Sequence, residues 1–301
     1  MNPLKNSPDE QAAEVAEATV AEAAVAEAAV AAIICAAGAS ARMGGTKKEY
    51  RPLPGAESGL TVLGAAVSAF AAVAAVKAIV IAVPADPAIG EAAARNALPP
   101  SLFAEKGGPA IHFVTGGATR RASVFNALSF VAARELPVNI ALIHDGARPW
   151  VSPALIQRVI DEVAAHRAVV PLLPLTETPK ETDSPLDANT GAVLIKRHLK
   201  RAVIGAAQTP QGFAFPEIHE AHRAAHRAAH QQAAARDDSL HETFTDDAEV
   251  WAEFCGPVAA IAGEPENRKI TFQEDLELIP QLINHGGLLS NGQLGVSGRG
   301  R

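Results

Sequence analysis

The sequence predicts an α/β fold in which a mostly parallel, twisted sheet is flanked by helices. Short apolar runs that suit buried strands alternate along the chain with longer segments of helical character. The chain has 301 residues, of which 48% are hydrophobic, enough to build a core of this kind. Because ligands of open α/β sheets bind outside the carboxyl ends of the strands, the loops after the apolar runs are the first places to seek function.

The elements are expected in regular alternation from the first apolar run, Ile33–Ala37, which is typical of a buried parallel strand. A second strand stops at Pro84, because proline cannot donate to a strand ladder. A helix begins after Ser152, whose side chain suits an N-cap. In chain order the expected elements are helix Thr61–Ala75, strand Ala78–Val83, strand Ile111–Thr115, helix Arg121–Glu135, strand Ile140–His144 and helix Pro153–His166.

The pattern changes after the apolar residues Val169–Pro171. Residues Thr176–Thr190 are rich in Thr, Glu, Asp and Pro, and Ala192–Ile204 alternates and is basic, which is typical of an extended hairpin. We expect a protruding β-arm at about residues 172–206, long enough to reach a second subunit. The chain then returns to helix Pro216–Ala235, helix Asp247–Phe254, strand Val258–Ala262 and a closing helix Phe272–Leu282.

Both ends of the chain differ from the central domain, which is expected to span residues 32–284. Residues 1–31 form a leader in which a VAEAA-like unit repeats from residue 11 onward, and its valines fall five apart, so they form no stripe on a helix. We interpret this leader as disordered or as a frayed helix, with a partner-binding helix as the alternative. The Gly/Ser-rich stretch 285–301 is expected to be a flexible tail.

Composition narrows the class of protein. A net charge of −7 and a pI near 5.8 argue against general nucleic-acid binding and favour small anionic ligands. Glutamates interrupt the apolar stretch of the leader, which predicts neither a secretory signal nor a membrane span. Two cysteines, Cys35 and Cys255, are too few for a disulfide scaffold, so we expect a cytoplasmic protein.

The segment from Ile33 to Leu53 is the strongest candidate for a phosphate cradle. It reads IICAAGASARMGGTKKEYRPL, in which small residues around Gly38 let backbone N–H groups approach phosphate oxygens. Arg42, Lys47 and Lys48 supply positive charge. The segment fits neither the P-loop nor the dinucleotide fingerprint. A plain strand-to-helix turn with solvated basic residues is the alternative interpretation.

Two further segments follow apolar strands. Asp145, in IALIHDGAR, is placed at a strand end near the cradle, where an acid beside a triphosphate suggests Mg²⁺, an ion commonly held by only one or two carboxylates. An Asp that caps a loop is the alternative. Gly116-Gly117 follows another strand and permits a tight turn against a base or ribose, although such a turn alone is weak evidence.

Six motifs now occur together: AAGASARM with KKEY, GGATRRASV, HDGARP, GAAQTPQGF, FTDDA and ENRKIT. With them the chain resembles the 2-C-methyl-D-erythritol 4-phosphate cytidylyltransferase family across about residues 33–283. The resemblance implies a Rossmann-like nucleotidyltransferase sandwich and a homodimer. It also implies that CTP and a sugar-alcohol phosphate react, with Mg²⁺ as cofactor, to give a CDP-linked product and pyrophosphate.

The resemblance also implies roles for individual residues. The catalytic set would be Arg42, Lys48 and Lys269. CTP would be bound by Ala36, Ala37, Gly38, Gly117, Ser123 and Asp145, with Asp145 on ribose or metal. The second substrate would be bound by Arg148, Thr178, Lys180, Arg201, Thr209 and Thr245. In this family the arm crosses to the partner, which implies that Thr178 and Arg201 serve the neighbouring subunit's site.

Some alternatives stay open at this level. Either Lys47 or Lys48 can be the catalytic lysine, and Lys48 is favoured because it directly precedes Glu49-Tyr50. In the opening loop, Ser40 replaces a glycine that is common in the family. Ribitol 5-phosphate is the rival second substrate, and a non-catalytic nucleotide-binding protein is the rival class. The histidines His219, His222, His226 and His230 could share a helix face, but the arginines and alanines between them favour an exposed helix over a metal site.

Overall fold

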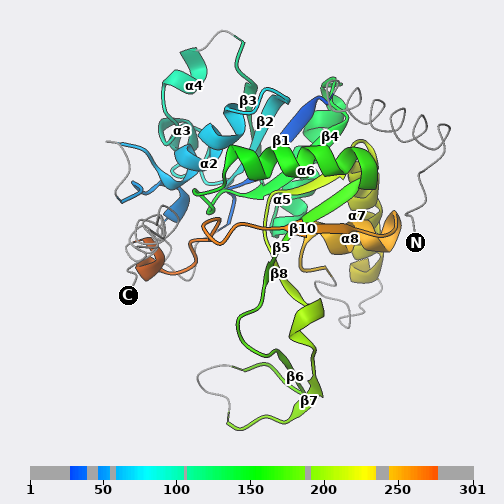
Figure 1. Cartoon of the computed structure of the whole chain (residues 1–301). Helices are drawn as coiled ribbons and strands as arrows, with labels where there is room; N and C mark the ends of the chain where they lie inside the picture. The colour runs from blue at the N-terminus through cyan, green and yellow to red at the C-terminus, as the bar shows by residue number, and fades with distance from the viewer. Residues whose placement is uncertain are drawn as a thin grey trace, which may run out of the picture.

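The computed structural model describes residues 28–38, 47–54, 59–104, 107–186, 191–234 and 244–276. Their centre is an eight-stranded sheet with the order β10-β5-β9-β4-β1-β2-β3, to which β8 adds by pairing with β5 (Figure 1). The strands are β1 Val30–Cys35, β2 Val76–Val83, β3 Ala110–Thr115, β4 Ile140–Asp145, β5 Ala168–Pro174, β8 Gly205–Ala207, β9 Gln211–Ala214 and β10 Ala259–Ala262.

The sheet is mostly parallel. β1 pairs in parallel with both β2 and β4, β2 with β3, and β5 with β10, whereas β9 runs antiparallel between β4 and β5. The chain moves from β1 outward through β2 to β3 and then returns to place β4 on the other side of β1. The strand order therefore reverses between β1 and β4, which is where open α/β sheets bind their ligands.

Helices cover both faces of the sheet. They are α2 Val62–Ala71, α3 Glu91–Asn96, α4 Ser101–Ala104, α5 Arg120–Ala133, α6 Pro153–His166, α7 Glu217–Ala234 and α8 Asp247–Phe254, with short 3-10 helices η2 Lys48–Tyr50 and η3 Arg201–Val203. Side chains of α2 and α6 share one buried cluster, and those of α5, α7 and α8 contribute to a second.

Strand β1 shows how the sequence builds two cores. Val30, Ala32 and Ile34 belong to the cluster under α2 and α6, whereas Ala31 and Ile33 belong to the opposite cluster. Successive side chains of a strand point to opposite faces, so a strand covered on both faces must be apolar at every position. The continuous apolar run in the sequence is thus explained by burial on both sides.

The structure confirms the predicted fold class, and several element boundaries agree. α6 and α8 begin and end at the predicted residues. The helix expected over Thr61–Ala75 is shorter: Thr61 is its N-cap, accepting from the Gly64 amide, and it ends at Ala71 before a turn into β2. Helices α3 and α4 and strands β8 and β9 were not predicted, because they are short and carry weak periodicity.

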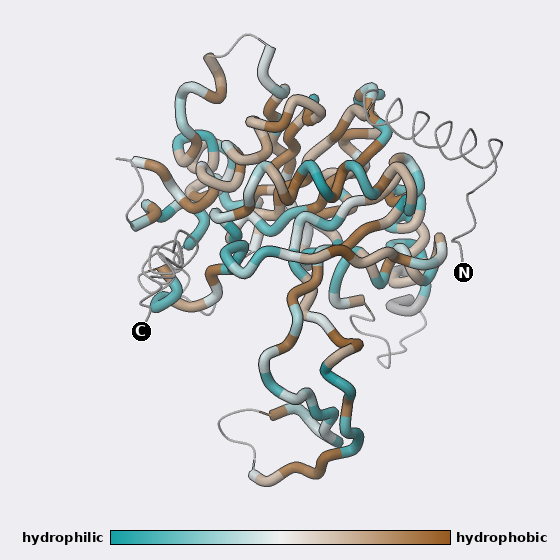
Figure 2. Tube along the Cα trace, viewed as in Figure 1, coloured by the Kyte–Doolittle hydropathy of each residue, from teal (hydrophilic) through white to brown (hydrophobic). Residues whose placement is uncertain are grey.

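The arm projects away from the body of the protein (Figure 1). Its paired strands are β6 Lys180–Thr182 and β7 Ile195–His198, which run antiparallel. The predicted bounds were too wide, because β5 stays in the main sheet as far as Pro174 and β8 rejoins it at Gly205. Figure 2 shows hydrophobic stretches along this arm, and their exposed members are Leu186, Leu194, Ile195 and Val203.

The leader was predicted over residues 1–31, of which 1–27 lie outside the described residues, but Val30 and Ala31 already belong to β1, which spans Val30–Cys35 and not the predicted Ile33–Ala37. Strand pairing begins earlier because Val30 and Ala31 are buried between β2 and β4. The tail expected at 285–301 and most of the closing helix expected over Phe272–Leu282 lie outside the described residues. At its start, the Asp275 carboxylate accepts hydrogen bonds from the Thr271 and Phe272 amides, a pattern typical of a helix N-terminus. Among the helices that the structure describes, none is both long and apolar enough to cross a membrane.

Candidate active site

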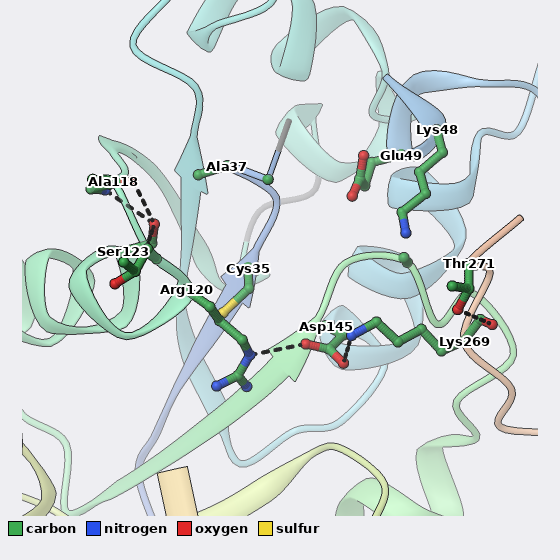
Figure 3. Close-up of a pocket in the computed structure, with 14 residues that line it drawn as sticks. Cys35, Ala37, Lys48, Glu49, Ala118, Arg120, Ser123, Asp145, Lys269 and Thr271 are labelled. Carbon is green, nitrogen blue, oxygen red and sulfur yellow. Dashed lines mark hydrogen bonds and ion pairs between the residues drawn. The ribbon is translucent and has the colours of Figure 1, made fainter. Parts of the chain in front are cut away.

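A cavity of about 460 Å³ lies at the carboxyl ends of the parallel strands, and we name it the strand-end cavity. Its floor comes from the last residues of β1 and β4, because Cys35 and Asp145 are register partners at the point where the strand order reverses. The cavity is lined by Cys35, Ala37, Gly38, Lys48, Glu49, Gly117, Ala118, Thr119, Arg120, Ser123, Asp145, Ala147, Lys269 and Thr271 (Figure 3).

One wall is the turn from β3 into α5. Thr119 caps the helix by accepting from the Ala122 amide, and the Ser123 hydroxyl accepts from the Gly117 amide at 3.0 Å. A Cβ on Gly116 would lie 2.3 Å from the Cβ of Ala37, so glycine lets this turn pack against the residues after β1. The N-terminus of α5 thus faces the cavity with backbone N–H groups, a setting that favours anions.

The opposite wall carries two lysines. Lys48 Nζ donates to the Ile270 carbonyl at 2.7 Å, and Lys269 Nζ lies 2.9 Å from Asp145 Oδ2. The segment that bears Lys269 is held by Asn267, whose side-chain amide donates to the Thr209 carbonyl, and by the Ile270 amide, which donates to the Ala147 carbonyl. Its position is therefore fixed by contacts with segments distant in the sequence.

Asp145 is the centre of a charged network. Oδ1 lies 3.3 Å from Arg120 Nε, and Oδ2 lies 2.9 Å from Lys269 Nζ (Figure 3). Arg148 Nε lies 3.6 Å from the same Oδ2. Burial alone would raise the pKa of this carboxyl, but the three neighbouring cations hold its pKa well below the usual range. Asp145 is therefore a carboxylate at every pH in which the protein is expected to work.

Burial keeps two other titratable groups at the strand ends neutral. Desolvation raises the pKa of the Cys35 thiol to about 12, so this cysteine stays protonated. Desolvation also lowers the pKa of His144 to about 4, and the neutral ring contacts the Thr209 hydroxyl and the Arg148 carbonyl. Neither group is suited to act as a nucleophile or as a proton carrier near neutral pH.

The structure brings together seven of the residues implied for nucleotide and catalysis. These seven line the strand-end cavity: Ala37, Gly38, Lys48, Gly117, Ser123, Asp145 and Lys269. Ala36 is fully buried below it, with its amide bonded to the Ala82 carbonyl. Arg42 lies outside the described residues.

Lys47 and Lys48 are clearly distinguished. Lys47 is buried, its ammonium donates to the Gly38 carbonyl at 2.7 Å, and it pairs with Glu49 at 3.1 Å. Lys48 instead lines the cavity. The geometry favours Lys48 for contact with a ligand and Lys47 for holding the cradle in place.

The residues implied for the second substrate are dispersed. Thr209 is buried and Arg148 partly buried beside Asp145: Arg148 also donates to the Asn267 carbonyl, and the Thr209 hydroxyl accepts from the Asp145 amide. Thr178, Lys180 and Arg201 are exposed on or near the arm and line neither described cavity. Arg201 is tied within the arm, since its guanidinium donates to the Thr176 carbonyl.

Thr245 lines a second cavity of about 310 Å³, which we name the α8 cavity. The lining residues are Arg120, Arg121, Phe244, Thr245, Asp246 and Asp247. Arg120 therefore lines both cavities, and sequence reasoning had assigned it no role. The available signal was its place in GGATRRASV, directly after a Gly-Gly turn that follows a strand.

The helix that bears the histidines differs from the sequence prediction at one position. His219 and His226 stack on Phe125, which accounts for them without a metal. His222 was expected on an exposed helix, but it is fully buried with Nε2 3.2 Å from Asp247. The alanine-rich sequence predicted an exposed helix, but the small alanine side chains let this face of α7 pack closely against its neighbours, which buries His222.

Comparison with known proteins adds independent findings. The model of the family IspD, 2-C-methyl-D-erythritol 4-phosphate cytidylyltransferase, matches residues 30–284. A bifunctional enzyme IspD/IspF of Nitrobacter winogradskyi is 40% identical over 248 residues, which cover 81% of this chain and 53% of that protein. A bifunctional enzyme IspD/IspF of Nitrobacter hamburgensis is 44% identical over 53% of this chain and 35% of its own length. The chain thus spans about half, or less, of the length of these relatives.

Solved structures agree with the fold. The 2-C-methyl-D-erythritol 4-phosphate cytidylyltransferase of Thermus thermophilus superposes with a TM-score of 0.58 at 29% identity, covering 85% of this chain and 99% of that one. The 4-diphosphocytidyl-2C-methyl-D-erythritol synthase of Anaerococcus prevotii superposes with a TM-score of 0.65 at 22% identity, covering 87% and 99%. The second likeness concerns the fold alone.

Proposed function

The chain belongs to the 2-C-methyl-D-erythritol 4-phosphate cytidylyltransferase family, and we propose that it transfers the cytidylyl group of CTP to 2-C-methyl-D-erythritol 4-phosphate in isoprenoid precursor synthesis. An oxygen of the phosphate monoester attacks the α-phosphorus of CTP and forms the new P–O bond. The bond between the α-phosphorus and its bridging oxygen breaks, and pyrophosphate leaves with that oxygen.

The observation that carries this proposal is the charge arrangement of the strand-end cavity. Three cations, Lys48, Arg120 and Lys269, and two carboxylates, Glu49 and Asp145, line it beside the small residues that follow β1 and β3. Glu49 is already paired with Lys47. The remaining positive excess suits a triphosphate, and preorganised cations around a transferring phosphoryl group stabilise the charge of the transition state.

The chemistry needs no protein base. The second pKa of a phosphate monoester is about 6, so near pH 7 the nucleophile is largely a dianion. What the site must do is hold two anions in line against their repulsion. The α8 cavity, which meets the strand-end cavity at Arg120, is a suitable place for the second substrate, with Thr245 as a hydroxyl contact.

We propose Mg²⁺ as the cofactor, held by Asp145 together with the nucleotide phosphates. One buried carboxylate fits this ion, because Mg²⁺ is commonly bound through one or two carboxylates plus phosphate oxygens. No cluster of three or more acidic, histidine or cysteine ligands is found among the described residues, so the phosphates must supply further oxygens. When bound, the ion neutralises phosphate charge, while Lys269, now on Asp145, orients the carboxylate.

We further propose a homodimer in which the arm contacts a second copy of the chain. The arm exposes large apolar side chains: Val203 is 80% exposed, Leu194 75% and Leu186 70%. Exposed apolar side chains gathered on one projecting element favour burial against a partner. Such a contact would let Thr178, Lys180 and Arg201 serve the partner's site, since they line no cavity of their own subunit among those described.

We place the activity in the cytoplasm. Both cysteines are free thiols in the structure, as is usual for proteins of reducing compartments.

Pyrophosphate release by the purified protein with Mg²⁺ and CTP tests the function. It should be measured with 2-C-methyl-D-erythritol 4-phosphate and, in parallel, with ribitol 5-phosphate. Turnover with the first substrate, lost in Lys269→Ala but kept in Lys77→Ala, supports the proposal; Lys77 is an exposed residue of β2. Turnover only with ribitol 5-phosphate would transfer the function to that substrate, and CTP binding without turnover would favour a non-catalytic protein.

A further inference from the structure

Arg120 occupies the wall shared by the two described cavities. It is the first residue of α5, and about a third of its side chain, 31%, is exposed. Its guanidinium spans two carboxylates: Nε lies 3.3 Å from Asp145 Oδ1, and Nη2 lies 2.8 Å from Asp247 Oδ2. The partly exposed guanidinium therefore has a fixed orientation where a ligand of either cavity can reach it.

Asp247 holds Arg120 from the side away from the strand-end cavity. The carboxylate is 1% exposed, and its two oxygens face different partners: Oδ2 faces Arg120 and Oδ1 faces His222 Nε2 at 3.2 Å. Burial alone would raise the pKa of Asp247, but Arg120 and His222 more than offset it and the pKa is lowered. A buried carboxylate of this kind is stable only while both partners remain.

The start of α8 fixes the place of Asp247. Asp246 caps the helix by accepting from the Glu249 amide, and its other oxygen accepts from the side-chain amide of Gln211. The Ala248 amide donates to Gln211 in return. Because Gln211 begins the buried strand β9, the carboxylate that holds Arg120 is anchored to the central sheet.

The side chain of His222 contacts a carboxylate of another helix. His222 lies on α7, its side chain is fully buried, and it meets Asp247 rather than solvent. A histidine offers a donor at Nε2 in the neutral tautomer protonated there or in the charged form. His222 therefore contacts Arg120 only through Asp247, in a relay from α7 through α8 to α5.

We propose that Arg120 is a further substrate-binding residue, which contacts the phosphate of the second substrate where the two cavities meet, and that Asp247 and His222 are positioning residues for it. This inference rests on the proposed cytidylyl transfer. A planar guanidinium can donate two parallel hydrogen bonds to one phosphate group, which suits its position at the wall shared by the two cavities. Lys48 and Lys269 hold the nucleotide phosphates on the other wall.

The first part of the test separates the two substrates. In Arg120→Lys, which keeps the charge but loses the planar fork, kcat/KM for the sugar-alcohol phosphate should fall by about 10²-fold, as for loss of one preorganised donor. The dissociation constant of CTP should change by less than about threefold, because the lysines remain. A loss of CTP affinity as large as the loss of kcat/KM would overturn the assignment, since Arg120 would then be a nucleotide contact.

The second part tests the relay. His222→Leu should lower kcat/KM by about tenfold, because the buried Asp247 loses the polar group that lies 3.2 Å from its Oδ1, and His222→Gln, which keeps a donor, should restore most of it. In the Arg120→Ala background His222→Leu should cost nothing more, because residues that act as a unit are not additive. Equal losses in both backgrounds would show that His222 only packs the core, and the relay would be refuted.

Matched controls keep the outcome interpretable. His219→Leu, on the same helix but in contact with Ser129, should leave kcat/KM unchanged in both backgrounds. If His222→Leu unfolds, as seen by circular dichroism, the Gln variant and Asp247→Asn carry the same comparison. Inorganic phosphate affinity, measured by calorimetry in wild type and Arg120→Lys, separates the two proposals. If wild type shows no turnover but Arg120→Lys loses phosphate affinity, the proposed function fails and the Arg120 site stands; unchanged phosphate affinity rejects the site.

Discussion

The ammonium of Lys269 lies 2.9 Å from a carboxylate oxygen of Asp145, although the two residues lie far apart in the sequence. Arg120 and Arg148 meet the same carboxylate, whose side chain is only 10% exposed. One anion therefore balances three cations at the floor of the strand-end cavity.

Asp145→Asn should consequently impair both stability and activity. Removing one partner of a buried charge group costs about 3 kcal/mol, because the cations lose their counter-ion. Pyrophosphate release should fall by roughly 10²-fold or more, since the proposed metal ligand is lost. Urea unfolding and turnover measure the two effects. Asp161→Asn, on the exposed part of α6, is the control; if Asp145→Asn matched it in both assays, the network would have no functional weight.

Substitution of the two adjacent lysines should affect different properties, turnover for Lys48 and stability for Lys47. Lys48→Ala should reduce turnover by about 10²–10³-fold with little change in unfolding free energy, because its ammonium lines the cavity. Lys47→Ala should lower the free energy of unfolding by about 2 kcal/mol, because it removes both the ion pair with the buried Glu49 and the hydrogen bond to the Gly38 carbonyl. Kinetics and denaturant titration of both variants check this, and the reverse pattern would exchange the assigned roles.

Gly116→Ala should deform the nucleotide side of the cavity. The new Cβ would lie 2.3 Å from the Ala37 Cβ and 2.8 Å from the Ser123 hydroxyl, closer than packed atoms can approach. We expect the KM for CTP to rise at least about tenfold and the free energy of unfolding to fall by 1–3 kcal/mol, the usual range for overpacking. Gly191→Ala is the control, since its Cβ would meet none of the described atoms within 4 Å. A variant of Gly116 with wild-type CTP binding would show that the turn can move freely.

The sequence was sufficient for the parts of this fold that depend on local patterns. Continuous apolar runs predicted β1 and β4, and the Ser152 cap predicted the start of α6, because burial on both faces and capping leave marks in neighbouring residues. The four-residue β9 has no such local pattern, since its place in the sheet comes from pairing with β4 and β5, which precede it in the chain.

The same limit applies to the site. Motif order predicted most residues of the strand-end cavity, but not the pairing of Arg120 with Asp247 or of His222 with Asp247. These contacts join α5, α7 and α8, which meet only in the folded chain. His222 carries the same periodic signal as His219, and only packing makes one a buried partner of a carboxylate and the other a neighbour of Phe125.

The apolar arm should determine the oligomeric state. Val203→Asp should weaken self-association by at least about tenfold, since it would bury a charge in the proposed contact, and it should leave the stability of the monomer unchanged because Val203 is 80% exposed. Sedimentation equilibrium measures this, with Phe103→Asp as the control on α4, away from the arm. A wild-type protein that stays monomeric at micromolar concentration would refute the dimer.

His112 should make the stability of the protein depend on pH. It lies on β3 and packs on Phe130 of α5, and its Nε2 has no hydrogen-bond partner among the described residues. Desolvation, with Arg134 nearby, lowers its pKa. The unfolded chain takes up the proton near the ordinary value of 6.5, whereas the folded protein resists it, so stability is full above that pH and is lost as pH falls below it.

His112→Phe should make that dependence shallower without removing it, because the buried His144 and the partly buried His219 also have lowered pKa values. The ring contact with Phe130 is kept and the unpaired nitrogen is removed, so the variant should match or exceed the wild type at pH 7 and gain on it toward pH 5. Urea midpoints measured at half-unit steps between pH 7.5 and about 5 give the comparison, with His166→Phe, at the exposed end of α6, as the control that keeps the wild-type slope. The depressed carboxylate pKa values of Asp145 and Asp247 act only at more acidic pH, so the slope that remains in His112→Phe comes from His144 and His219. A slope as steep as that of the wild type would show that His112 contributes nothing.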